Sequence, residues 1–246
     1  MDPTALLWIA LLMGLAAALY STVGHGGASA YLAIMALFAV APETMRPTAL
    51  ALNLVVAGFG FVRYGWAGQI NFRLLAAFAL TAAPAAFLGG SFSLPPEYYR
   101  PLVGLILWAA AARLFWQPAR LARREPRPPS LAVALPTGAG LGLLAGLTGT
   151  GGGIFLSPLV VLLGWEEARR TSGIAAGFIF INSLAGLAGN WASVRSLPAE
   201  LPILVAAVAA GAVVGTWLGA GRLRKPRLLQ GLGLVLLIAG AKLIFA

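Results

Sequence analysis

Residues 21–27 read STVGHGG and residues 148–153 read TGTGGG, and each stretch interrupts a long apolar run. Unpaired backbone groups cost several kcal/mol each in lipid, so such an interruption persists only where protein or a watery cavity receives it. Glycine suits the turn because it adopts positive φ and lets a ligand approach the backbone. The two stretches therefore predict two broken helices inside a membrane protein.

The composition around these stretches predicts a chain embedded in lipid. Of the 246 residues, 60% are hydrophobic and 10% are charged, with a mean hydropathy of +0.89, whereas a soluble domain carries about 25% charged residues. Ten apolar segments are expected, at about 4–21, 28–41, 47–64, 73–93, 99–117, 131–147, 153–164, 170–189, 199–220 and 227–245. The sequence thus predicts an all-α, polytopic membrane protein with a single membrane domain over residues 1–246.

An internal repeat divides this domain. The polar gap 118–130 separates an N-terminal repeat, 1–117, from a C-terminal repeat, 131–246. Residues 24–27 match residues 149–152, and other matched positions keep an offset between 124 and 127 residues. Because each half contains five segments, the second half is expected to enter the membrane from the opposite side, which is an inverted repeat.

The basic residues predict the orientation. If the linker 118–130 is cytoplasmic, thirteen of the 17 Lys and Arg residues lie on the cytoplasmic side and four on the other, as the positive-inside rule requires. Both termini are then periplasmic in a bacterial inner membrane. The net charge of +10 is attributed to these loops, so no nucleic-acid partner is expected. Segments 28–41 and 153–164 are short for full spans, so they are expected to be broken or re-entrant helices.

The candidate substrate site consists of the two breaks and the polar residues near them. The helix after each break directs free N–H groups and the positive end of its dipole into the turn, which favours an anion. His25 is the only histidine, and an ionisable group inside the membrane is a functional candidate. The predicted substrate-binding residues are Thr22, Gly24, His25, Gly26, Gly27, Asn53, Gly149, Thr150, Gly151, Gly152, Gly153 and Asn182. No catalytic residue, metal ligand or cofactor is predicted.

Other polar residues receive structural interpretations. Thr48 and Thr171 are interpreted as caps at helix starts, and Asn190 as a cap at a helix end. Tyr64 is expected to reach the membrane interface from the end of its segment.

The acidic residues favour an anion as the substrate. All seven fall in termini or loops, so no carboxylate at membrane depth is available to bind a cation. The inside-negative potential drives anions outwards by about 2.3 kcal/mol per charge per 100 mV. We therefore expect a secondary transporter, and an exporter in particular, in which one repeat rocks against the other. Three alternatives stay open: a metal or cation transporter using His25 and backbone carbonyls, an intramembrane enzyme, and a structural membrane subunit.

The paired glycine motifs resemble those of the sulfite exporter TauE/SafE family. The resemblance rests on residues 24–27, on residues 149–153 followed by Pro158, and on Gly-Gln-Ile-Asn at 68–71. It also rests on matching helix starts in which a basic residue precedes a hydroxyl residue, at Arg46 to Thr48 and at Arg170 to Ser172, and it covers nearly the whole chain. It implies transport of small anions such as sulfite, sulfonates or related sulfur-containing oxyanions. The expected partners are this anionic substrate and membrane lipid, with a homo-oligomer left open.

Overall fold

The computed structural model describes residues 3–115, 126–221 and 226–245, and these ranges are helical with no β-strand. The helices are α1 (Pro3–Ser21), α2 (Ala28–Leu37), α3 (Pro42–Trp66), α4 (Phe72–Ser91), α5 (Pro96–Phe115), α6 (Leu131–Thr148), α7 (Gly153–Leu162), α8 (Ala168–Gly189), the 3₁₀ helix η2 (Trp191–Ser196), α9 (Leu201–Gly221) and α10 (Pro226–Phe245). Each of the ten predicted segments corresponds to one α-helix, so the all-helical prediction is confirmed. Residues 116–125, which include most of the predicted linker, lie outside the described residues.

Six helices are long and apolar enough to cross a membrane: α1, α3, α4, α6, α8 and α9. Large apolar side chains on their outer faces are open, with Leu7 69% exposed on α1, Leu80 72% exposed on α4 and Trp217 68% exposed on α9. Lipid is the solvent that accepts such a surface without cost. The chain is therefore a multi-pass membrane protein.

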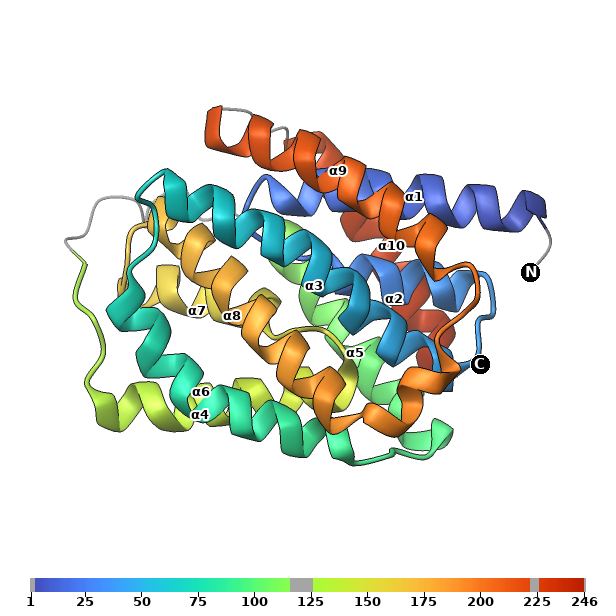
Figure 1. Ribbon diagram of the computed structural model, residues 1–246, viewed down its shortest axis with the longest axis horizontal. Helices are drawn as coiled ribbons and strands as arrows, with labels where there is room; N and C mark the ends of the chain where they lie inside the picture. Colours follow the sequence, from blue (N-terminus) through green and yellow to red (C-terminus); the bar gives the residue numbers. More distant parts are fainter. Residues whose placement is uncertain (1–2, 116–125, 222–225, 246) are drawn as a thin grey trace.

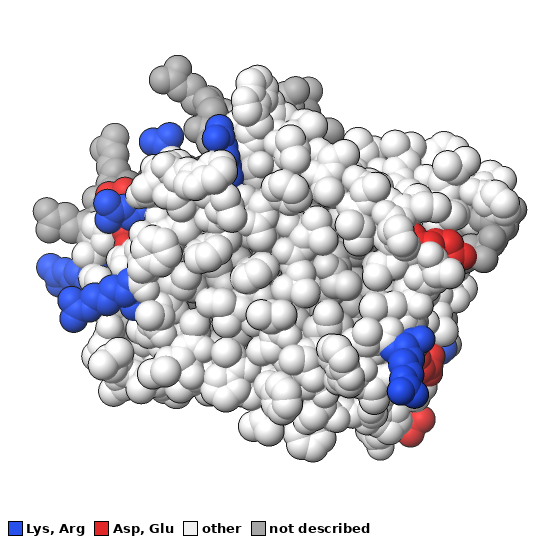
Figure 2. Space-filling view, in the orientation of Figure 1, with Lys and Arg blue, Asp and Glu red and all other residues white. Residues whose placement is uncertain are grey.

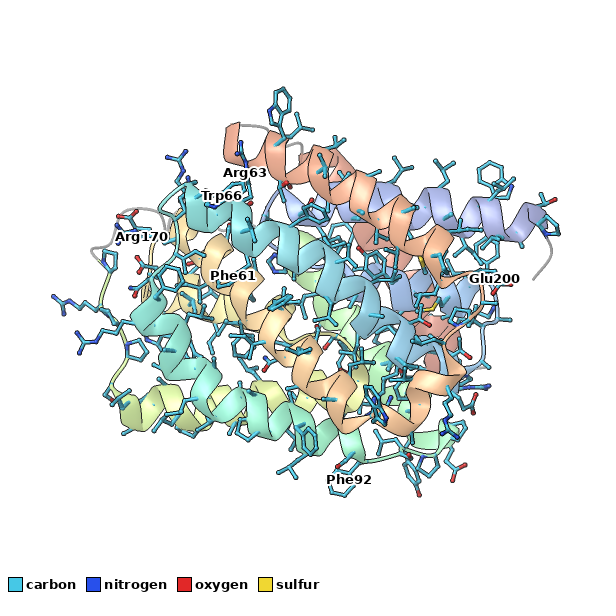
Figure 3. The ribbon with its side chains drawn as sticks, viewed as in Figure 1. Phe61, Arg63, Trp66, Phe92, Arg170 and Glu200 are labelled. Carbon is cyan, nitrogen blue, oxygen red and sulfur yellow. The ribbon has the colours of Figure 1, made fainter. Side chains whose placement is uncertain are left out.

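The helices run between two ends of the molecule (Figure 1). The helix α1 begins at the end where α10 finishes, whereas α6 begins at the opposite end. Lys and Arg side chains gather at the end where α6 begins (Figure 2), and Figure 3 labels Arg63 and Arg170 there, with Glu200 at the other end. This charge distribution follows the positive-inside pattern, with both chain ends opposite the basic cluster.

Two hydrophobic cores hold the helices together. The first core takes buried side chains from α1, α2, α3, α5, α9 and α10, and the second from α4, α6, α7 and α8. Ile154 at the start of α7 and Phe61 near the end of α3 reach across to the other core. Each core therefore combines helices from both sequence halves.

Small residues let the exchanged helices approach closely. The helix α4 packs on α6, where Gly142 leaves no room for a side chain beside the backbone of Ala82. In the same way α9 packs on α1, where Gly211 lies against the backbone of Gly14. Other close pairs are α5 with α10, α4 with α8, α3 with α8 and α3 with α9. Exchanging the two halves turns each of these pairs into itself or into another pair of the set, and the inverted repeat stays a prediction.

One predicted helix start and two predicted caps are wrong. Pro42 stands in the first turn of α3, a position where its missing N–H is not needed, so the helix begins five residues before the expected start. Thr48 is consequently inside the helix and fully buried. Thr171 donates its hydroxyl to the Glu167 carbonyl at 2.8 Å instead of capping α8. Asn190 is the residue that ends α8, as predicted.

The short helices are shorter than expected. The helices α2 and α7 have ten residues each, which at about 1.5 Å per residue corresponds to about half of the hydrocarbon thickness. Each returns towards the end of the molecule at which the preceding helix began (Figure 1). Their starting residues therefore lie inside the protein.

Candidate functional site

Both short helices begin on a left-handed glycine. Gly27 has φ 96° ahead of α2, and Gly152 has φ 78° ahead of α7. Neither helix start has a side-chain cap. Within the described part of the chain, the backbone N–H groups of residues 26–29 and 151–154 form no hydrogen bond. Two positively polarised helix ends thus present free donors.

Asn53 and Ile179 lie between the two breaks. A Cβ atom added to Gly26 would lie 2.8 Å from Asn53 Cγ and 3.1 Å from Ile179 Cγ2. On Gly151 the corresponding distances are 2.7 Å to Asn53 Nδ2 and 2.8 Å to Ile179 Cγ2. The structure therefore brings Gly26, Gly151 and Asn53 together, and only glycine leaves room for the amide at both turns.

Unpartnered polar atoms collect at this meeting point. Asn53 Nδ2 lies 3.4 Å from the Thr150 carbonyl, whereas its Oδ1 atom has no partner among the described residues. The same holds for the Ser183 hydroxyl, which lies 3.1 Å from the Cβ position of Gly151. Both side-chain atoms of the predicted site residue Asn182 also lack a partner among the described residues, but Asn182 is not among the nearest neighbours of either glycine turn. Leaving such a group buried and unpaired costs about 1–3 kcal/mol. We call the break residues 26–29 and 151–154 with Asn53 and Ser183 the central seat, and its free groups match a polar occupant.

The other predicted residues of the first break turn towards α1. Thr22 donates its hydroxyl to the Leu19 carbonyl at 2.6 Å. His25 is half-buried, its Nδ1 atom lies 3.1 Å from the Val23 carbonyl, and its ring meets the Tyr20 ring edge-on at 6.2 Å. These contacts place Thr22 and His25 at the end of α1, beside the seat.

Each break also touches a long helix of the other sequence half. Gly24 leaves no space for a side chain beside the Ser172 carbonyl of α8. A Cβ on Gly149 would lie 3.1 Å from the Arg46 carbonyl of α3. The Thr150 hydroxyl lies 3.0 Å from that of Thr148 at the end of α6. Both turns are thus held between the two halves.

Two tyrosines that the sequence analysis did not assign to the site hold the ends of the preceding helices. Tyr64 donates its hydroxyl to the Ser21 carbonyl at 3.1 Å and the Thr22 carbonyl at 3.2 Å. Tyr99 donates to the Thr148 carbonyl at 3.2 Å. The expectation that Tyr64 reaches the interface is wrong because its side chain is 2% exposed and points into the protein.

The sequence analysis attributes the basic residues to loops, whereas Arg46 is buried in α3. Its side chain is 6% exposed, and it donates to the Phe92 carbonyl at 2.7 Å, the Gly89 carbonyl at 3.2 Å and the Gly90 carbonyl. A guanidinium suits this position because the carbonyl end of a helix is negatively polarised. The early start of α3 brings Arg46 into a helix that faces the end of α4.

Comparison with known proteins identifies the family. The family model described as "Sulfite exporter TauE/SafE" matches residues 9–243. The chain belongs to the sulfite exporter TauE/SafE family. It is also similar to the "Probable membrane transporter protein y4hK" of Sinorhizobium fredii (strain NBRC 101917 / NGR234), with 40% identity over 229 residues, which are 92% of this chain and 93% of the relative. No solved structure matches the chain. These findings make it a membrane transporter rather than an enzyme.

The breaks of this TauE/SafE protein are closed to the outside. Gly24, Gly26, Gly27 and residues 149–153 are all buried, and Asn53 and Asn182 are fully so. An occupant of the central seat would therefore be enclosed. Exchange of that occupant with either side of the membrane requires helices to move apart.

Proposed function

We propose that this TauE/SafE protein is a secondary transporter of the bacterial inner membrane that exports small anions. The proposed substrate class is sulfite, sulfonates and related sulfur-containing oxyanions, in keeping with the family description. The observation that supports an anion most directly is the pair of left-handed helix starts whose free N–H groups meet at Asn53.

The chemistry of the seat favours negative charge. Helix starts bind anions because their N–H groups and dipoles point at the ligand. The Ser183 hydroxyl and the amide of Asn53 add hydrogen-bond donors in the same region. The buried carboxylate of Glu166 lies away from the seat in the loop after α7, where it accepts from Asn71 Nδ2 at 2.6 Å and from the Glu167 N–H at 3.0 Å. The outward driving force on an anion, about 2.3 kcal/mol per charge per 100 mV, supports export.

The two cores supply the moving parts of the proposed mechanism. The first break joins α1 to α2 in the first core, and the second break joins α6 to α7 in the second core. The seat thus lies where the two cores meet. Displacing one core relative to the other would open the seat to one side and then to the other, which is alternating access. This division replaces the expected motion of one repeat against the other, because α4 packs with α6 and α9 packs with α1.

Anion flux into proteoliposomes tests the proposal. The purified chain is reconstituted, and uptake of sulfite, methanesulfonate, thiosulfate and sulfate is compared with uptake of sodium and a divalent cation. Asn53→Leu removes the amide at similar volume. Because a hydrogen bond to a charged group contributes about 1.5–3 kcal/mol, kcat/KM should fall by about tenfold or more.

Thr137→Val serves as the matched control, because the Thr137 hydroxyl only donates to Val133 in its own helix, at 2.7 Å. We expect wild-type flux from this variant. Cation flux without anion flux, or full anion flux in Asn53→Leu, would contradict the proposed function.

A further inference from the structure

A cavity of about 90 Å³ opens at the end of the molecule where α3 and α5 begin. Its wall includes Arg46, Tyr99, Asn190 and Ser193, with Glu43 and Ser93 also contributing. This cavity is separate from the central seat, since none of its lining residues belongs to either glycine break. With the proposed orientation it faces the periplasm.

Arg46 gives the cavity a buried positive charge with spare bonding capacity. Three of its contacts go to carbonyl oxygens at the end of α4. Its Nε atom has no partner among the residues that the structure describes. An unpaired donor on a buried charged group is costly. Arg46 lines the cavity, so an anion that enters the cavity meets this charge.

Two helix starts reinforce this charge. Pro42 opens α3 and Pro96 opens α5, and both prolines line the cavity. Helix starts are positively polarised and favour an anion within their first turn. The carboxylate of Glu43 is the opposing charge in the wall, and it sits at an exposed position, where water screens it more than it screens buried Arg46.

The side chains that form the cavity also touch the second glycine break. Tyr99 donates to the Thr148 carbonyl at 3.2 Å. A Cβ on Gly149 would lie 3.2 Å from Arg46 Cγ. Movement of the second break would therefore displace Tyr99 and Arg46, which line the cavity. Arg170, which matches Arg46 in the other repeat at an offset of 124 residues, is exposed.

We propose that the Arg46 cavity is a second anion site, a relay site that receives the substrate after it leaves the central seat. The ligand class is the same small oxyanion, so the inference rests on the proposed transport function. The positive charge of Arg46 beside the second break would attract an anion that leaves the central seat. The anion would occupy the Arg46 cavity before its release into solution.

Binding stoichiometry tests the relay site. Titration calorimetry with methanesulfonate, which stays ionised across the usable pH range, should find two anions for each wild-type chain. Arg46→Gln should lose one anion, and Asn53→Leu should lose the other. Because Arg46 also caps α4, Ser93→Glu provides a second variant, since it adds a negative charge to the cavity wall at an exposed loop position.

The matched control is Ser91→Glu, an exposed serine near Ser93 that does not line the cavity. We expect the affinity of the Arg46 cavity for methanesulfonate to fall at least tenfold in Ser93→Glu and to change less than threefold in Ser91→Glu. The relay site is overturned if the wild type binds a single anion that Asn53→Leu loses and that Arg46→Gln and Ser93→Glu retain. That result would leave the proposed transport function standing. No methanesulfonate or sulfite binding by the wild type overturns both.

Discussion

Two engineered disulfides distinguish motion of the two cores from motion of the two sequence halves. The chain has no cysteine, so each introduced pair supplies the only thiols. Gly14→Cys with Ala207→Cys joins α1 to α9, which belong to different halves and to the same core. Gly60→Cys with Ala176→Cys joins α3 to α8, which belong to different halves and to different cores.

The structure sets the geometry of both bonds. A Cβ on Gly14 lies 3.7 Å from Ala207 Cβ, and a Cβ on Gly60 lies 3.3 Å from Ala176 Cβ. Disulfides span about 3.5–4.5 Å between Cβ atoms, with a mean of about 3.8 Å. The Cβ separation of the first pair lies in this range, although the new Cβ would lie 3.0 Å from the Ala207 carbonyl oxygen, so α1 and α9 must shift slightly. The second pair requires a separation of about 0.2 Å. Both bonds should therefore form in the closed molecule under mild oxidation.

The assay is sulfite or methanesulfonate flux in proteoliposomes before and after oxidation, and again after reduction with dithiothreitol. Flux in the variant with cysteines at 60 and 176 should fall in proportion to the fraction of chains that are cross-linked, and it should return on reduction. Flux in the variant with cysteines at 14 and 207 should stay within about twofold of the flux of the same variant after reduction, because α1 and α9 move together. A block by the Gly14–Ala207 bond, or full flux with the Gly60–Ala176 bond, would refute the two-core division.

Three further predictions concern single residues. Gly151→Ala should abolish flux and lower the melting temperature more than Gly164→Ala does, because both glycines have positive φ but only Gly151 lies against other side chains; the left-handed conformation alone costs about 1–2 kcal/mol. Tyr64→Phe should lower the thermal stability by an amount equivalent to about 1 kcal/mol, because two carbonyls at the end of α1 lose a donor, and unchanged stability would remove Tyr64 from the support of the first break. Glu166→Leu leaves Asn71 Nδ2 and a backbone N–H without their acceptor, so unfolding in detergent should become easier by about 1–3 kcal/mol, and Glu166→Gln should recover part of the loss.

The apolar runs and glycine clusters predicted most of the fold. Ten segments follow from hydropathy because lipid demands continuous apolar helices. The ends of the short helices escaped this reasoning, since residues 38–41 are as apolar as the helix before them. There the chain turns through Ala39, which has φ 56°. Gly164, with φ 66°, follows α7 in the same way. Hydropathy does not register such turns.

The site residues that could be predicted are those that differ clearly from their neighbours in the sequence. Glycine clusters and a lone amide such as Asn53 stand out in an apolar segment. Ser183 carries a weaker signal, as the neighbour of Asn182, and it was missed. The positions of Tyr64 and Arg46 depend on which helices pack together, because each bonds to carbonyls more than 40 residues away in the sequence. Such partners follow from tertiary packing and cannot be predicted from the residues that adjoin Tyr64 or Arg46 in the sequence.

The exchange of α4 and α9 between the halves also constrains how the protein is made. When the first five helices have entered the membrane, α4 still lacks α6 and α1 still lacks α9. The contact of Gly142 on Ala82 waits for α6, and the contact of Gly211 on Gly14 waits for α9, near the end of the second half. Biogenesis must therefore hold an incomplete bundle in the bilayer until late in translation, and halves expressed as separate chains should mature only when they are present together.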